Sequence, residues 1–253
     1  MLCRVTTEAR SVLVSMLVLA CGVCLYDARV WRPMATPCPQ VTRCDCKIRK
    51  GIYVTCRNFS NFQELAPDMA RLQHVEVKQL FFNHVQISEI PAGWFSNHTI
   101  VKLIVRNCPL RDIGVAAMVG MSRLAHLTLE KDQIESVPIG LGAATHLRTL
   151  QIRRNPLKFL TGVLQLPRLV KLNLRLNKIE SIDETFLSAS PNLKVLLLSG
   201  NHIQHIPSRL FENTRNLKAV EIRDNPITII SSLFDGLRYL QVRHSLPKIP
   251  NDP

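Results

Sequence analysis

A short leucine-based pattern recurs along most of this chain with a period of about two dozen residues. Each copy has the order LxxLxLxxNxL, with other aliphatic residues at some leucine positions. The clearest copies are LRTLQIRRNPL (147–157), LVKLNLRLNKI (169–179), LKVLLLSGNHI (193–203) and LKAVEIRDNPI (217–227). One copy cannot bury its apolar edge alone, so neighbouring copies must stack and share a continuous core. The pattern therefore predicts a solenoid.

Looser copies extend the repeat toward both ends, namely VKQLFFNHVQI (77–87), IVKLIVRNCPL (100–110), LAHLTLEKDQI (124–134) and a degraded copy from Leu237. Pattern and period are similar to those of the leucine-rich repeat, and about eight repeats are expected over residues 71–253. The resemblance implies an α/β solenoid of horseshoe form. Its concave side would carry a parallel β-sheet, and its convex side loops or short 3₁₀ turns.

The asparagine position predicts a buried ladder, because an amide there bonds backbone groups that the turn would otherwise leave unsatisfied. Cys108 occupies this position two residues after Arg106. A nearby cation can activate a thiol, but a thiol is also a small, weak donor, and no histidine base stands at a matching position. We therefore assign Cys108 to a structural role. The expected ladder is Val85, Cys108, Asp132, Asn155, Asn177, Asn201, Asn225 and Ser245.

The N-terminus indicates export. Arg4 and Arg10 precede an apolar run over residues 11–25, and the chain turns polar from Asp27. This is the order of a secretory signal peptide, which we place at residues 1–24 and follow with a short linker at 25–36. The apolar run is shorter than the roughly 20 residues that span a bilayer, although an uncleaved anchor stays open. We expect a secreted or extracellular protein and no membrane span in the mature chain.

Four cysteines cluster within residues 37–70, just before the first repeat, with the spacing Cx5CxCx9C. A zinc site is the competing interpretation, but an exported protein favours disulfides. The cluster resembles the N-terminal cap of extracellular leucine-rich repeat proteins such as Slit, the small matrix proteoglycans, Toll-like receptors and neuronal adhesion receptors. The resemblance implies the pairs Cys38–Cys46 and Cys44–Cys56, since spacing alone allows three connectivities.

The cysteine cap that closes the C-terminal end of those proteins does not follow Leu237. The last coil is therefore expected to expose Leu240, Val242 and Ile249 unless something covers them. Two interpretations stay open. The chain is a fragment or isoform of a longer receptor ectodomain, or a partner covers this end.

Motifs of catalysis are absent from the sequence, including HExxH, GxSxG, phosphate-binding glycine loops and kinase signatures. His202 and His205 flank a core isoleucine, and we expect them to be solvent-exposed histidines and not metal ligands. The sequence predicts a protein that is not an enzyme and that has no cofactor or metal.

Binding through the sheet is the predicted function. Outward side chains of successive strands form columns on the concave face, and one column reads Asn83, Arg106, Glu130, Arg153, Arg175, Ser199, Arg223, Arg243. Arginine pairs well with carboxylate and sulfate groups, although a merely solvated basic face is the plainer alternative. The candidate binding residues are Phe81, Lys102, Arg106, Gln151, Arg153, Lys171, Asn173, Arg175, Arg223 and Arg243.

The charge balance indicates the kind of partner. The chain has 32 Lys and Arg against 19 Asp and Glu, a formal net charge of +13, which favours anionic partners. For an exported chain we expect an extracellular protein with an acidic surface, in an adhesion or receptor role, and no nucleic acid. A matrix role with heparan sulfate or matrix proteins as partners is the alternative. Sequons at Asn58 and Asn97 predict N-glycosylation.

Overall fold

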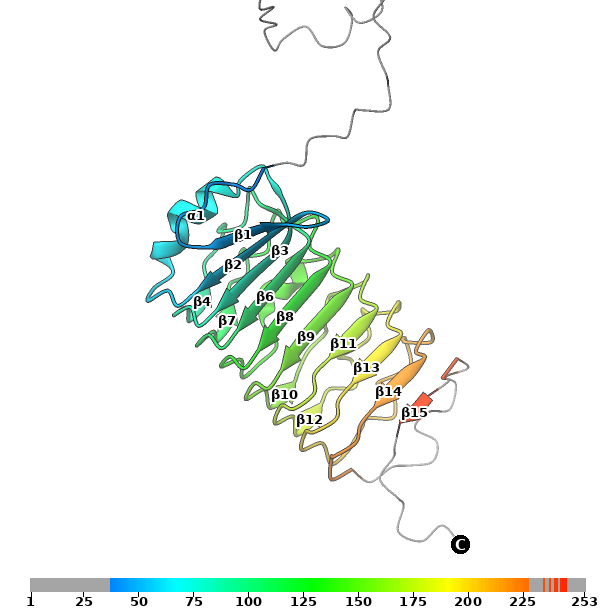
Figure 1. The fold of residues 1–253 in the computed structure, drawn as a ribbon. Coiled ribbons are helices and arrows are strands. Elements are labelled where there is room, and N and C mark those ends of the chain that lie inside the picture. The colour runs from blue at the N-terminus through cyan, green and yellow to red at the C-terminus, as the bar shows by residue number, and fades with distance from the viewer. Residues whose placement is uncertain (1–36, 228–233, 235–236, 238, 241, 245–253) are drawn as a thin grey trace, which may run out of the picture. The chain divides into compact units, whose positions relative to one another are not determined.

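The structure is a computed structural model that describes residues 37–227, 234, 237, 239–240 and 242–244. The predicted signal peptide, the predicted linker, Ser245 and Ile249 lie outside these residues. The described chain is a solenoid of about 7 turns built from parallel strands and few helices (Figure 1). The predicted leucine-rich repeat fold is confirmed.

One 11-stranded sheet follows the length of the solenoid (Figure 1). Its strands β2 to β15 pair in parallel, β1 pairs antiparallel with β2, and β5 (Thr99–Ile100) pairs with the start of β3. In spatial order the others are β1 (Asp45–Ile48), β2 (Ile52–Arg57), β3 (Glu76–Asn83), β6 (Lys102–Arg106), β8 (His126–Glu130), β9 (Thr149–Arg153), β11 (Lys171–Asn173), β13 (Val195–Leu197), β14 (Ala219–Glu221) and β15 (Val242–His244).

The repeated leucines set the register of this sheet. Leu103, Leu127 and Leu150 occupy matching positions on neighbouring strands and are buried. Side chains alternate across a strand, so the residues between the leucines point away from the core and are half-exposed in β6 and β9. The leucine spacing thus produces the outward columns on which the binding hypothesis rests.

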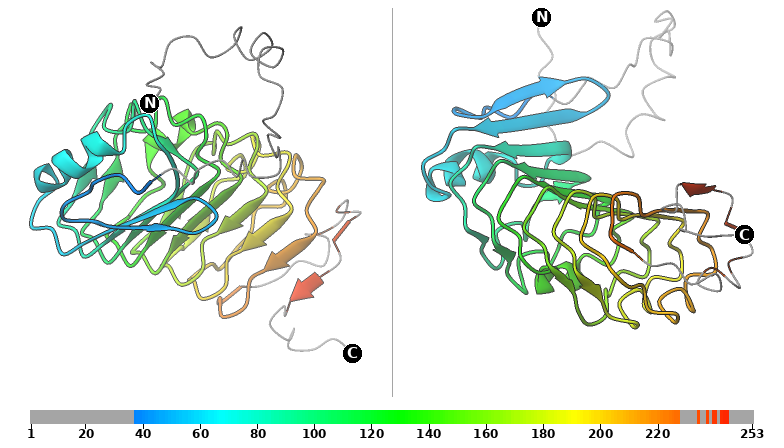
Figure 2. Two further views of the ribbon diagram at one scale, coloured as in Figure 1. Left: turned by 45° about the horizontal axis from the view of Figure 1, so that its top comes forward. Right: turned by 90° about the horizontal axis from the view of Figure 1, so that it is seen from below.

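The other side of each coil has little regular structure. Two short parallel pairs lie there, β4 (Glu89–Ile90) with β7 (Asp112–Ile113) and β10 (Phe159–Leu160) with β12 (Ser181–Ile182). The 3₁₀ helix η3 (Ile139–Ala143) packs against its neighbour so closely that a Cβ on Gly140 would lie 2.2 Å from the Gly114 carbonyl oxygen. Figure 2 shows these loops closing each coil opposite the sheet.

A disulfide-bonded cap covers the first coil. Disulfides join Cys38 to Cys46 and Cys44 to Cys56, the pairs that the resemblance implies. The 3₁₀ turn η2 (Gln63–Leu65) and helix α1 (Ala66–Arg71) follow. The buried Asp68 carboxylate of α1 accepts the backbone N–H groups of three residues at 2.7 to 2.8 Å, which are Thr42, Arg43 and Cys44.

The asparagine ladder lies where the chain leaves each strand. Asn177 is buried, accepts the Asn155 N–H at 2.8 Å, and donates to the carbonyl oxygens of Ile152 and Leu174 at 2.8 and 2.7 Å. Asn201 and Asn225 make the same kinds of contact. Each amide therefore links two coils through backbone groups that water cannot reach.

Cys108 lies in this ladder. Its thiol donates to the Arg106 carbonyl oxygen at 3.3 Å, and its N–H donates to Asp132 Oδ1 at 2.9 Å. Burial raises the pKa of the Cys108 thiol to about 11. Because the thiolate is the reactive form, this environment suits packing better than catalysis.

The last repeat departs from the predicted alignment. That alignment put Arg243 beside Arg223, whereas the structure pairs Arg243 of β15 with Val220 of β14. The degraded copy lacks the regular leucines and the ladder asparagine that set the register elsewhere. Leu240 was expected to be exposed, but it is partly buried and packs against the core.

Candidate ligand-binding face

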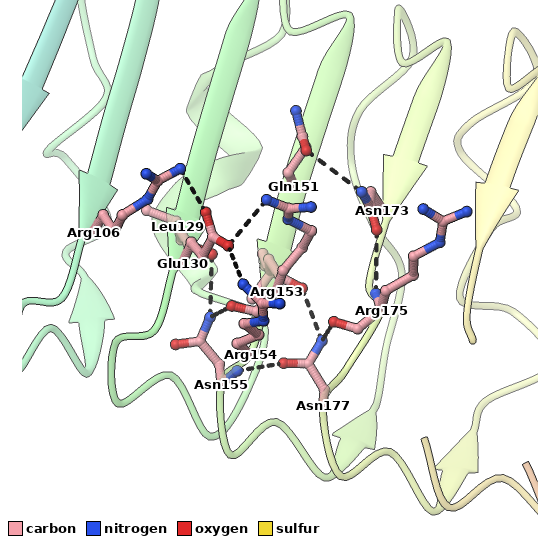
Figure 3. A network of polar contacts seen from close by, with 11 residues as sticks. Arg106, Leu129, Glu130, Gln151, Arg153, Arg154, Asn155, Asn173, Arg175 and Asn177 are labelled. Atoms are coloured by element: carbon pink, nitrogen blue, oxygen red, sulfur yellow. Dashed lines mark hydrogen bonds and ion pairs between the residues drawn. The ribbon is translucent and has the colours of Figure 1, made fainter. Parts of the chain in front are cut away.

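A buried carboxylate organises the centre of the outward sheet face. Asn83, Arg106, Glu130 and Arg153 follow one another across β3, β6, β8 and β9, so the sheet register brings cations to both sides of Glu130. Arg106 Nη2 lies 2.7 Å from Glu130 Oε2, and Arg153 Nη2 lies 3.0 Å from Oε1 (Figure 3). Arg154, just beyond β9, adds a third contact at 3.2 Å. We call these four charged residues the arginine clamp: Arg106, Glu130, Arg153 and Arg154.

The clamp keeps Glu130 ionised. Burial acts to raise the pKa of this carboxyl group, but the charges and hydrogen bonds of Arg153 and Arg106 outweigh burial and leave the pKa below its ordinary value. Three guanidinium groups share one carboxylate, so the clamp keeps an excess of positive charge. The side chains of Arg106 and Arg153 are 42% and 30% exposed, which leaves part of each guanidinium open to a ligand.

A second carboxylate lies farther along the face. Glu221 on β14 forms an ion pair with Arg175, two coils away, and accepts the Ser199 hydroxyl at 2.7 Å. Burial acts to raise the pKa of Glu221, but the hydrogen bonds from Ser199 and Arg175 lower it below its ordinary value. The arginine column is therefore held in place by two acidic residues and is not a row of independent cations.

Two predicted contact residues have different environments. Asn173 is buried, accepts the Arg175 N–H at 3.2 Å, and donates to Gln151 Oε1 at 3.4 Å (Figure 3). Its amide therefore positions its neighbours, and little of its surface is left for a ligand. Gln151 is partly exposed on β9.

The remaining candidates lie at different distances from the clamp along the sheet. Phe81 lies beside it on β3, with its ring centre 5.7 Å from the Arg106 guanidinium carbon, a cation–π distance. Lys102 and Lys171 begin β6 and β11 and are partly exposed. Arg223 is exposed just beyond β14, whereas the register of β15 removes Arg243 from this column.

The sequence interpretation missed the acidic partners. Glu130 had a detectable signal, because it occupies the same column as Arg106 and Arg153 one coil away on each side. Opposite charges at matching positions of adjacent strands form cross-strand pairs. Glu221 gave no such signal, because its pairing with Arg175 skips the intervening strand and depends on side-chain length.

The face is suited to recognition by polar contacts. It presents partly exposed guanidinium groups, one aromatic ring and an amide on a rigid sheet, and forked donors of this kind bind carboxylates. Among the described residues, no group of three or more His, Cys, Asp and Glu side chains is placed to hold a metal ion. In that same part of the chain, no helix is long and apolar enough to cross a membrane.

Comparisons with known proteins agree with the fold. The sequence profile described as leucine rich repeat matches residues 145–203 and 191–245. Keratocan of Danio rerio is 26% identical over 181 residues, 70% of this chain and 45% of that protein. Podocan of Mus musculus is 26% identical over 62% of this chain and 22% of its own length. Podocan-like protein 1 of Homo sapiens is 28% identical over 74% of this chain and 37% of its own length. The chain thus spans less than half of each of these relatives.

Two solved structures share the fold. An internalin C2 from Listeria monocytogenes str. 4b F2365 has a TM-score of 0.58 at 23% identity over 75% of this chain and 78% of its own. TLR13, in a complex with ssRNA13, has a TM-score of 0.57 at 19% identity over 74% of this chain and 30% of its own. Repeats, cap and matches together define this chain as a leucine-rich repeat protein with a disulfide-bonded N-terminal cap. In sequence it is similar to keratocan and the podocans.

Proposed function

We propose that this protein is an extracellular recognition module that binds a protein ligand through its concave sheet face and performs no catalysis. The observation that carries this proposal is the arginine clamp, in which a buried glutamate positions three arginines at the centre of a rigid face. Fixed side chains favour binding, because less conformational entropy is lost when the ligand docks. A receptor or adhesion role fits this arrangement.

Extracellular placement has independent support. The disulfides of the cap suit an oxidising compartment, and the sequon residues Asn58 and Asn97 are exposed. We propose both as glycosylation sites and retain residues 1–24 as the signal peptide. Neither sequon lies on the strands that carry the clamp, so attached sugars would leave its face accessible.

The ligand chemistry follows from the charges. The clamp and Arg175 would pair with acidic side chains on the ligand. Because Glu130 and Glu221 already neutralise part of the arginine column, a ligand at this face must match a mixed pattern of charges. Such a pattern favours an acidic protein surface over a uniformly charged polymer.

The test is binding of the labelled, secreted protein to a panel of cultured cell lines treated with heparin lyase. Arg153→Gln with Arg175→Gln should reduce binding about tenfold or more, since each lost charge-assisted contact costs roughly 1.5 to 3 kcal/mol. The control pair Lys158→Gln with Lys178→Gln removes the same charge from exposed sites outside the sheet face and should bind normally. Equal losses in both pairs would refute a concave binding site.

A further inference from the structure

A second group of cations lies along the edge where the parallel strands begin. In Figure 1 the arrows from β6 to β14 point the same way, so the starts of these strands share one edge of the sheet. Four neighbouring coils, those of β9, β11, β13 and β14, place basic residues there, and five of the six are exposed and one is partly exposed. We call this set the basic rim: Arg148, Arg168, Lys171, Lys194, Arg215 and Lys218.

The basic rim lacks the acidic partners of the concave face. The matching segments that form it, 144–149, 166–171, 190–195 and 214–219, contain no Asp or Glu. Across the described part of the chain, no carboxylate lies within ion-pairing distance of the six side chains. The arginine clamp, in contrast, is built around Glu130.

Hydrogen bonds between coils hold the backbone of the rim in place. The Lys218 N–H donates to the Lys194 carbonyl oxygen at 2.8 Å. Asparagine amides at the turns add side-chain links, with Asn192 Nδ2 donating to the Pro167 carbonyl oxygen at 2.8 Å and Asn216 Nδ2 to that of Pro191 at 3.0 Å. The cations therefore repeat at the strand spacing of about 4.8 Å and cover three such spacings, about 15 Å.

Burial and nearby positive charges lower the pKa of a histidine beside the rim. His126 begins β8, the strand beside β9. Burial lowers the pKa of His126, and the positive charges of Lys102 and Arg148 lower it further. Lys102 of β6 and Arg148 of the rim therefore both act on His126, so positive charge also lies on the coils before β9.

A regular row of unpaired cations fits a polymer with a regular row of anions. We propose that the basic rim binds a linear sulfated polysaccharide that runs across the coils. The four rim segments contain no Phe, Tyr or Trp, and His146 is their one aromatic side chain, whereas a surface that binds unpaired nucleic acid presents aromatic side chains for successive bases. They also lack the large exposed apolar side chains with which a protein surface inserts into a membrane.

This site shares Lys171 with the candidate binding residues of the concave face but otherwise uses different cations, and it changes the earlier expectation for heparan sulfate. As the alternative to a protein ligand, the sequence interpretation placed a sulfated polysaccharide on the arginine column, but Glu130 and Glu221 partly neutralise that column. Polyanion binding and protein recognition are thereby assigned to different surfaces. Each can fail without the other, because the concave test uses cells from which heparan sulfate has been removed.

The experiment measures binding of the secreted full chain to immobilised heparin as salt concentration rises. Lys194→Glu with Lys218→Glu should lower affinity about tenfold or more and weaken the salt dependence, because fewer counterions are released on binding. The matched control is Lys158→Glu with Lys178→Glu, two exposed lysines beyond the other edge of the sheet. Control affinity should change less than about threefold. Melting temperatures of all three proteins verify folding.

Two further probes separate heparin from other polyanions. A single-stranded RNA oligonucleotide and phosphatidylserine vesicles, tested at the same salt concentration, should bind more weakly than heparin. Equal loss in the rim and control pairs, or an unchanged rim variant, would overturn the proposal. Tighter binding of RNA or vesicles through Lys194 and Lys218 would overturn the assignment to a sulfated polysaccharide.

Discussion

Asp132 occupies a ladder position that asparagine fills in the next four coils, so it has a carboxylate oxygen where those residues have an amide nitrogen. Its Oδ1 accepts the Cys108 N–H, but its buried Oδ2 has no hydrogen-bond partner. At the equivalent position, Asn155 Nδ2 donates to the carbonyl oxygens of Leu129 and Arg153. Burial is the main cause that raises the pKa of Asp132 from 3.8 to about 7. A protonated Asp132 has an O–H that can donate as the asparagine amide does.

We expect Asp132→Asn to stabilise the protein by about 1 to 3 kcal/mol at pH 8, since it removes a buried unsatisfied charge. A raised pKa in the folded state means that protonated Asp132 contributes its full stability below pH 3.8. This contribution declines as pH rises and is lost through about pH 7. The gain in melting temperature should therefore be larger at pH 8 than at pH 4. A gain independent of pH, or equal to that of exposed Asp224→Asn, would contradict this account.

At the scale of single elements, the N-terminal cap depends on helix α1. Asp68 is buried and binds three backbone N–H groups of the segment that carries the cap cysteines, together with the Thr42 hydroxyl. Burial acts to raise the pKa of Asp68, but these hydrogen bonds outweigh burial and lower it. Asp68 thus ties helix α1 to the segment that the two disulfides cross-link.

Asp68→Asn should destabilise the protein by about 1.5 to 3 kcal/mol at pH 7, because an amide can accept at only one of its two positions. The folded-state pKa is lowered, so the stability from Asp68 is present above pH 3.8 and is lost as pH falls below that value. Chemical unfolding should show a difference from the wild type that shrinks below about pH 4. Exposed Asp45→Asn in the same cap serves as the control and should have little effect.

The sequence predicts the strands better than it predicts the contacts between their side chains. Leucine spacing sets the register from β3 to β14, because a shift by one residue would turn buried leucines outward. The same spacing identifies the outward position of Arg153. It gives no signal for Asp68, whose partners precede it by about two dozen residues, and it misplaces Arg243 because the last repeat has lost the regular pattern.

At the scale of the whole molecule, the positive charges form two different surfaces. The net charge of +13 does not say where the basic residues lie on the surface. The sheet register places arginines beside Glu130 on the sheet face and leaves the basic rim without carboxylates. The first arrangement favours selective contacts, and the second favours long-range attraction that salt screens. We therefore expect salt to weaken heparin binding at the rim more than protein binding at the clamp.

A glycan attached to the sheet face would block a ligand that docks there. Gln151→Asn with Arg153→Thr creates the sequon Asn-Ile-Thr on β9, where position 151 points outward. Gln133→Asn with Glu135→Thr creates the same tripeptide around Ile134 at two exposed residues outside the sheet. The single variant Arg153→Thr is the control for loss of the Arg153 guanidinium group without an added glycan.

The measurement is binding of these secreted, glycosylated variants to cells treated with heparin lyase. We expect the glycan at position 151 to abolish binding, Arg153→Thr alone to weaken it, and the glycan at position 133 to leave it at the wild-type level. Full binding by the variant glycosylated at position 151 would contradict a ligand site on the concave face.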